Sequence, residues 1–299
     1  MLARWGIKRS SPWNSWPRKC YPTSRIGRAM TDEIIIPGAG FKEKFAEADG
    51  FSIRYMEAGS GPVIVSLHGA NGLQLSRTHD MLAESHRVIV VEVPGFGNSQ
   101  ENTRAEDMKD LAVSILAFIE ALGLETLNMM GMSFGGKLAL TCSILKPEIM
   151  ESIILIAPAA IRPDRTSENI PTHAQRAAAL FAHPERQPAP NKLSAEIIAK
   201  QEDLVGRTMG PGRSEAFEAK LAELQVPVLA LFGTEDILIP PEIGKYYREI
   251  LPNCFLMIVY DAAHAIDADR PEAVTELIQD FVARRGDFIV REEDDTIHP

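Results

Sequence analysis

Short apolar runs alternate with longer helical patterns along the chain from about residue 41 onward. Seven of the apolar runs predict β-strands, at residues 51–56, 63–67, 87–91, 126–130, 152–157, 227–232 and 255–260. Several of them, such as VIVSL and VLALF, are apolar at nearly every position. Such runs are typical of strands that are buried on both faces of a largely parallel sheet.

Helical patterns separate these runs, and the clearest ones span residues 105–122, 134–145 and 271–285. The first has acids in its opening turn and ends at Gly123, and the last opens with Pro-Glu and closes with Arg-Arg-Gly. These charges match the helix dipole. Strands that alternate with helices predict an α/β protein with a doubly wound, mostly parallel sheet and helices on both faces.

Residues 159–224 lie between two predicted strands and contain no strand-like run. Helical patterns occur near 173–183, 194–205 and 213–224, and the segment is too long for a simple loop. We therefore expect a small helical cap at 159–224, inserted into a core of residues 31–158 and 225–285, with an acidic C-terminal tail at 286–299.

The composition is that of a globular protein, with 299 residues, 45% hydrophobic and 24% charged positions. The formal net charge of −10 argues against nucleic acid or an anionic membrane as the main partner. The chain contains no apolar run long enough for a transmembrane helix. Its three cysteines are too few and too scattered for a disulfide framework or a metal site, so we expect a cytoplasmic protein.

The first thirty residues differ from the rest of the chain. They carry seven basic residues, no acid, and all three tryptophans, Trp5, Trp13 and Trp16. They lack the apolar stretch of a secretory signal. We expect a mobile basic arm at 1–30 without a catalytic role, or translation that starts at Met30. An arm that docks with its tryptophans over an apolar patch stays open as an alternative.

The strongest chemical signal is the segment Gly-Met-Ser-Phe-Gly-Gly around Ser133, which follows an apolar run and precedes a helical pattern. A serine on such a tight strand-to-helix turn needs small neighbours, which Gly131 and Gly135 provide. The geometry lifts the hydroxyl out of the turn. Ser133 is therefore the predicted nucleophile.

A serine hydroxyl needs a base, and that base needs an acid to hold its tautomer. His264 follows the last predicted strand, and Asp236 follows the strand at 227–232, with Glu235 as its neighbouring competitor. The order Ser133, Asp236, His264 is the order expected of a triad in this type of sheet. The other histidines outside the strand ends, among them His79 and His86, are interpreted as surface or insertion residues.

An oxyanion needs two hydrogen-bond donors placed in advance. The backbone N–H of Phe134, directly after the nucleophile, is one candidate. The second is the N–H of Ala70, in the loop His-Gly-Ala-Asn-Gly after the strand at 63–67. His68 of the same loop is interpreted as structural.

Together these motifs resemble the α/β-hydrolase superfamily over residues 41–285. The resemblance rests on HGANG at 68–72, VPGFGNS at 93–99, GMSFGG at 131–136, GTED at 233–236 and the loop with His264. It implies a sheet of about eight strands, a helical cap and no cofactor.

The resemblance leaves the reaction less well defined. A serine at the elbow argues against the carboxylate nucleophile of dehalogenases and epoxide hydrolases. The hypothesis is a serine hydrolase of a small ester or related carboxylated compound, as a monomer or homodimer. A C–C bond or amide hydrolase stays open, and so does a small-molecule receptor on the same fold. Asn71, Arg162, Arg165 and Arg176 are candidate substrate contacts, the arginines as clamps for a carboxylate.

Overall fold

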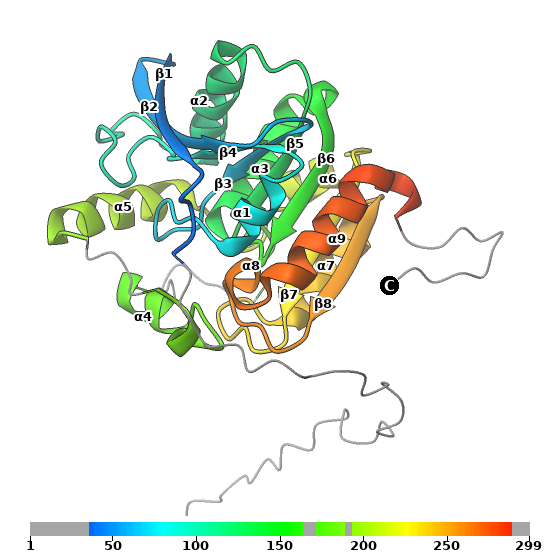
Figure 1. Cartoon of the computed structure of the whole chain (residues 1–299). Helices are drawn as coiled ribbons and strands as arrows, with labels where there is room; N and C mark the ends of the chain where they lie inside the picture. Colours follow the sequence, from blue (N-terminus) through cyan, green and yellow to red (C-terminus); the bar gives the residue numbers. More distant parts are fainter. Residues whose placement is uncertain (1–35, 164–171, 189–192, 289–299) are drawn as a thin grey trace, which may run out of the picture. The chain divides into compact units, whose positions relative to one another are not determined.

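The fold is built on one mixed sheet, seen in a computed structural model that describes residues 36–163, 172–188 and 193–288 (Figure 1). The eight strands are β1 (Lys42–Ala48), β2 (Phe51–Ala58), β3 (Val63–Leu67), β4 (Arg87–Val91), β5 (Leu127–Met132), β6 (Met150–Ile156), β7 (Val228–Gly233) and β8 (Cys254–Val259). Their order across the sheet is β1-β2-β4-β3-β5-β6-β7-β8. Only the β1–β2 and β2–β4 pairings are antiparallel within the described residues. The predicted mostly parallel eight-stranded sheet is thus confirmed.

Seven of these strands lie where the apolar runs predicted them, within a few residues at each end. The eighth, β1, was not among those runs. Its sequence KEKFAEA is charged and mostly exposed, and among the described strands it pairs only with β2, at the edge of the sheet. Only Ala46 and Ala48, near its end, face the core, so the strand leaves no apolar run in the sequence.

Helices cover both faces of the sheet. One face is packed by α2 (Met108–Ala121), α3 (Phe134–Leu145) and α7 (Gly244–Ile250), and the other by α1 (Arg77–Leu82), α8 (Ile266–Asp269) and α9 (Pro271–Arg284). The predicted helix at 105–122 begins at Met108, because Asp107 caps it by accepting hydrogen bonds from the Lys109 and Asp110 amides. The short helices α1, α7 and α8 were not predicted, since none is long enough to show a helical period.

Between β6 and β7 the described residues form α4 (His173–Ala178), α5 (Ala195–Thr208) and α6 (Glu215–Ala222). The expected helix near 173–183 ends at Ala178. The amides of Ala182 and His183 donate to the Asp269 carboxylate instead, so they are not available for helical hydrogen bonds. Helix α5 is held to the loop after β4 by Lys200 Nζ, which donates to the carbonyls of Gly97 and Ser99 at 3.0 and 2.8 Å.

At the C-terminal side the ordered contacts continue to Phe288, past the expected start of the tail at 286. Phe288 is buried and packs edge-on against Phe255 and Phe281. Residues 1–35, 164–171, 189–192 and 289–299 lie outside the described part of the chain. The predicted basic arm, with its three tryptophans, the candidate contact Arg165 and most of the tail fall in these ranges. None of the described helices has the length and apolar character needed to span a bilayer.

Candidate active site

Ser133 stands on the turn between β5 and α3, in a backbone conformation that is rare for a residue with a side chain. Its φ is 52° and its ψ is −111°. Such values are strained and persist only where the surroundings enforce them. A Cβ added at Gly131 would lie 2.3 Å from the Gly135 carbonyl oxygen, and one at Gly135 would lie 2.2 Å from the Leu67 carbonyl oxygen. The two glycines therefore allow the close backbone approach on which this turn depends.

Asp236 and His264 meet at the carboxyl ends of β7 and β8. Asp236 Oδ2 lies 2.8 Å from His264 Nδ1, and both side chains are almost completely buried. The other carboxylate oxygen accepts hydrogen bonds from the amides of Leu238 and Ile239 at 2.8 and 2.9 Å. Asp236 is therefore fixed in place. In a neutral imidazole this contact selects the tautomer with its proton on Nδ1, so that Nε2 is the nitrogen that can accept a proton.

Ser133 and His264 line two pockets together. The larger one, called here the His79 pocket, has an empty volume of about 610 Å³ and opens to solvent. The second, the Arg162 pocket, is walled by Phe134, Val205, Met209 and Leu238 among others. No hydrogen bond joins Ser133 to His264 within the ranges the structure describes. Nucleophile–base contacts are often long in free enzymes and shorten when substrate binds.

The two residues predicted to donate to the oxyanion, Ala70 and Phe134, line one pocket together with Ser133. Phe134 starts α3, and Ala70 lies in the loop after β3 and lines both pockets. Neither of these backbone N–H groups donates a hydrogen bond to another residue in the described part of the chain. Free N–H groups at a helix start and an adjacent loop are suited to bind a developing negative charge.

The candidate substrate contacts differ in where the structure places them. Arg176 lines both pockets, and its Nε donates to Asn71 Oδ1 at 3.1 Å. Burial lowers the pKa of Arg176 from its ordinary value, and Glu202 partly opposes this effect. Asn71 lines the His79 pocket, and Arg162 lines only the other one. Arg165 lies outside the described residues.

Two histidines interpreted as surface residues are buried, so that interpretation is wrong for His79 and His86. His79 lies on α1, lines a pocket beside Ser133 and is hydrogen-bonded to Ser66 and Ser76. The burial of His79 could not be predicted, because α1 is too short to show a helical period in the sequence. His68 accepts a hydrogen bond from the Val93 amide, and burial lowers its pKa to about 4, which agrees with the predicted structural role.

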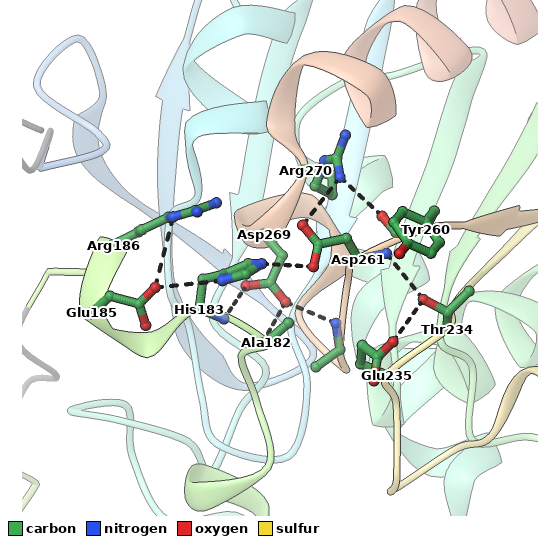
Figure 2. A network of polar contacts seen from close by, with 11 residues as sticks. Ala182, His183, Glu185, Arg186, Thr234, Glu235, Tyr260, Asp261, Asp269 and Arg270 are labelled. Atoms are coloured by element: carbon green, nitrogen blue, oxygen red, sulfur yellow. Dashed lines mark hydrogen bonds and ion pairs between the residues drawn. The ribbon is translucent and has the colours of Figure 1, made fainter. Parts of the chain in front are cut away.

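The loop that carries His264 is tied to the segment after α4 by a polar network shown in Figure 2. Asp269 accepts hydrogen bonds from Ala182, His183 and Ala263, and His183 Nε2 lies 2.9 Å from Asp261 Oδ1. Asp269 was not among the candidate residues. Nothing in its local sequence distinguishes it from a solvated acid at a helix start.

The family model for the alpha/beta hydrolase fold matches residues 62–197. A hydrolase of 2-hydroxy-6-oxononadienedioate and 2-hydroxy-6-oxononatrienedioate from Burkholderia vietnamiensis is 24% identical, over 85% of this chain and 100% of that protein. A pimeloyl-[acyl-carrier protein] methyl ester esterase from Vibrio campbellii is 26% identical, over 78% and 99% of the two chains.

Among solved structures, a serine hydrolase involved in carbazole degradation superimposes with a TM-score of 0.65 at 21% identity. The match covers 82% of this chain and 100% of that one. The similarity extends over nearly the whole of each relative. The chain has the alpha/beta hydrolase fold.

Proposed function

We propose that this hydrolase of the alpha/beta fold is a serine hydrolase that cleaves a small ester or a related carboxylated acyl compound. The observation that carries the proposal is the buried pair of Asp236 Oδ2 and His264 Nδ1, 2.8 Å apart, beside a serine held at a φ of 52°. Strain of this kind is maintained by the two flanking glycines. Strained residues of this kind cluster at active sites, which supports a hydroxyl that is presented to a substrate.

The chemistry follows from these positions. His264 Nε2 takes the proton of the Ser133 hydroxyl as Oγ attacks the carbonyl carbon of the substrate. The N–H groups of Phe134 and Ala70 bind the oxyanion. His264 then gives the proton to the leaving oxygen as the carbonyl–oxygen bond breaks, which leaves an acyl-enzyme. A water molecule, deprotonated by His264, attacks the acyl carbon and releases the acid and free Ser133.

Two pockets that share Ser133 and His264 suit a substrate with a group on each side of the scissile bond. Arg176, which borders both, supports a carboxylate on the substrate, because a guanidinium binds carboxylate through two N–H groups. The Burkholderia relative is named for dicarboxylate substrates, which supports the same substrate class.

A C–C bond hydrolase is the second candidate, and the same arginine together with that relative favours it. It would use the same three residues but break a bond to carbon instead of oxygen. A receptor on this fold is the third candidate, and turnover separates it from both enzymes. A receptor should stop after about one event per molecule, whereas an enzyme should cycle at about 10 per second.

The test compares wild type with Ser133→Ala in the hydrolysis of p-nitrophenyl acetate and butyrate. A second assay tests the C–C reaction, with a carboxylic acid in which a ketone activates the neighbouring C–C bond for cleavage. The matched control is Ser60→Ala, at an exposed position. We expect Ser133→Ala to lose at least about 10³-fold in kcat and Ser60→Ala to lose nothing. Undiminished ester hydrolysis by Ser133→Ala would contradict the proposal.

A further inference from the structure

The His79 pocket contains a buried polar cluster that the triad and the oxyanion donors do not use. It consists of Ser66 on β3, His79 on α1 and Asp267 on α8, which line the pocket and are 4%, 5% and 5% exposed. Many of the remaining walls are apolar, among them Leu67, Met132 and Ile156. Three separate elements thus bring polar groups to one place in an otherwise largely apolar wall.

This cluster lies deeper in the fold than the nucleophile. In the register of the parallel strands, Ser66 is paired with Val90 on one side and with Met130 on the other. All three residues line the pocket, and Met130 precedes Ser133 by three positions on β5. The pocket therefore runs from Ser133 inward to this row of the sheet, and a group bound between them would occupy its inner end.

The hydrogen bonds of His79 determine what Ser66 can offer. The Ser76 amide, which can only donate, points at His79 Nδ1 at 3.0 Å, so the imidazole proton must be on Nε2. Nε2 then donates to Ser66 Oγ, 3.1 Å away. Burial lowers the pKa of His79, an effect that Asp267 and Asp80 partly oppose. Ser66 Oγ is the acceptor in this bond, and its own proton has no acceptor among the described residues, so it can be donated into the pocket.

Asp267 supplies the complementary group. Its backbone carbonyl is anchored by Thr78 Oγ1 at 2.7 Å. Its carboxylate makes no hydrogen bond or ion pair to any residue within the described ranges. A buried carboxylate without a donor is unfavourable unless water or a ligand supplies one. The inner end of the pocket thus presents one acceptor, Asp267, and one donor, the Ser66 hydroxyl.

We propose that the His79 pocket binds the hydroxyl-bearing end of the substrate, with the hydroxyl donating to Asp267 and accepting from Ser66. A hydroxyl group matches both partners at once, whereas an alkyl end leaves both unpaired. The inference rests on the proposed ester hydrolysis, because it describes how one arm of that substrate is recognised. A site built to bond a hydroxyl strongly rejects an analogue that lacks it.

The experiment measures kcat/KM for matched pairs of esters in which a terminal hydroxyl replaces a terminal methyl. On the acyl side, p-nitrophenyl 6-, 7- and 8-hydroxyalkanoates are compared with the methyl-ended esters of equal chain length. On the alcohol side, the monobutyrate of hexane-1,6-diol is compared with heptyl butyrate. We expect the hydroxyl-bearing ester to be preferred at least about tenfold at one chain length, on one of the two sides.

Two variants assign that preference to the cluster. Ser66→Ala and Asp267→Ala should each bring the hydroxyl-to-methyl ratio close to one, while the matched control Asp287→Asn, at an exposed carboxylate, should keep the wild-type ratio. Ser66→Ala removes a single oxygen atom, so it remains informative even if Asp267→Ala folds poorly.

The outcomes separate this inference from the proposed function. Ester hydrolysis that depends on Ser133 but has no hydroxyl preference at any length, on either side, overturns the inference alone. A preference that survives in both Ser66→Ala and Asp267→Ala overturns it as well. If no ester is cleaved in a Ser133-dependent manner, the proposed function fails, and the inference fails with it.

Discussion

Asp269 Oδ2 accepts a hydrogen bond from the backbone N–H of Ala263 at 2.8 Å, directly before His264 in the chain. The same oxygen accepts from the Ala182 amide at 2.9 Å. Through one buried carboxylate, the loop that carries the proposed base is joined to the segment that follows α4 (Figure 2). Asp269 does not line either of the two pockets, so its influence on the site is exerted through backbone position.

Asp269→Ala should therefore lower kcat more than it raises KM for ester hydrolysis, because His264 loses its support while the pocket walls remain. The loss of these hydrogen bonds should also lower the free energy of unfolding by about 1–3 kcal/mol. Steady-state kinetics and urea denaturation measure the two effects. The control is Asp280→Asn, which removes only an ion pair to Arg284 at the helix surface. Equal kinetics in Asp269→Ala and wild type would show that the loop holds its position without the carboxylate.

Asp236→Asn should reduce kcat by about 10⁴-fold, since an amide in this place no longer selects the imidazole tautomer with its proton on Nδ1. Oδ1 can still accept from Leu238 and Ile239 in the variant, so folding should be retained. The circular dichroism spectrum checks the fold, and single-turnover kinetics check the acylation step. A loss of less than tenfold would assign the role of the acid to another residue.

Gly131→Ala should destabilise the fold by several kcal/mol, because its Cβ would lie 2.3 Å from a backbone oxygen that cannot move without opening the elbow. The matched control is Gly206→Ala, inside α5, where an added Cβ meets no atom within 4 Å. That control should gain about 0.5–1 kcal/mol from helix propensity. The free energy of unfolding in urea measures both, and equal effects in the two variants would refute the steric argument.

The stability should fall as the pH is lowered from 6.5 to about 4, with a contribution from His68. Its pKa is lowered to about 4 in the folded protein from 6.5, so below pH 6.5 the unfolded chain binds a proton that the folded chain does not. This contribution is fully present above pH 6.5 and is lost as the pH falls towards 4. Urea unfolding at several pH values measures the effect. The free energy of unfolding should depend less steeply on pH in His68→Gln than in wild type, and an equal pH dependence in both proteins would contradict the contribution of His68.

Arg176→Met should reduce kcat/KM for carboxylate-bearing esters by about 10–100-fold relative to neutral esters, as expected for the loss of a charge-assisted hydrogen bond. Monomethyl glutarate and methyl valerate form a suitable pair, followed by alkali uptake at constant pH. Arg186→Met, at a side chain that is 61% exposed, is the matched control. If the ratio of kcat/KM between the two esters is the same in wild type, Arg176→Met and Arg186→Met, the proposal of an anionic substrate is wrong.

Local patterns in the chain were sufficient to predict the α/β class, because buried parallel strands are apolar at nearly every position. They were also sufficient to locate the elbow, since a strand, a Gly-x-Ser-x-Gly turn and a helix follow one another in the sequence. Strand β1 and helices α1, α7 and α8 were missed, because an exposed edge strand and helices of a few residues carry no distinct period.

The sequence by itself determined which side chains come at the ends of which strands, and so it nominated Ser133, Asp236 and His264. Only the tertiary structure decided which polar groups from unrelated segments share a pocket. Ser66, His79 and Asp267 belong to separate elements and meet because α1 and α8 pack on one face of the sheet, against β3. Contacts of this kind depend on packing between elements, and packing leaves no periodic signal within any one of them.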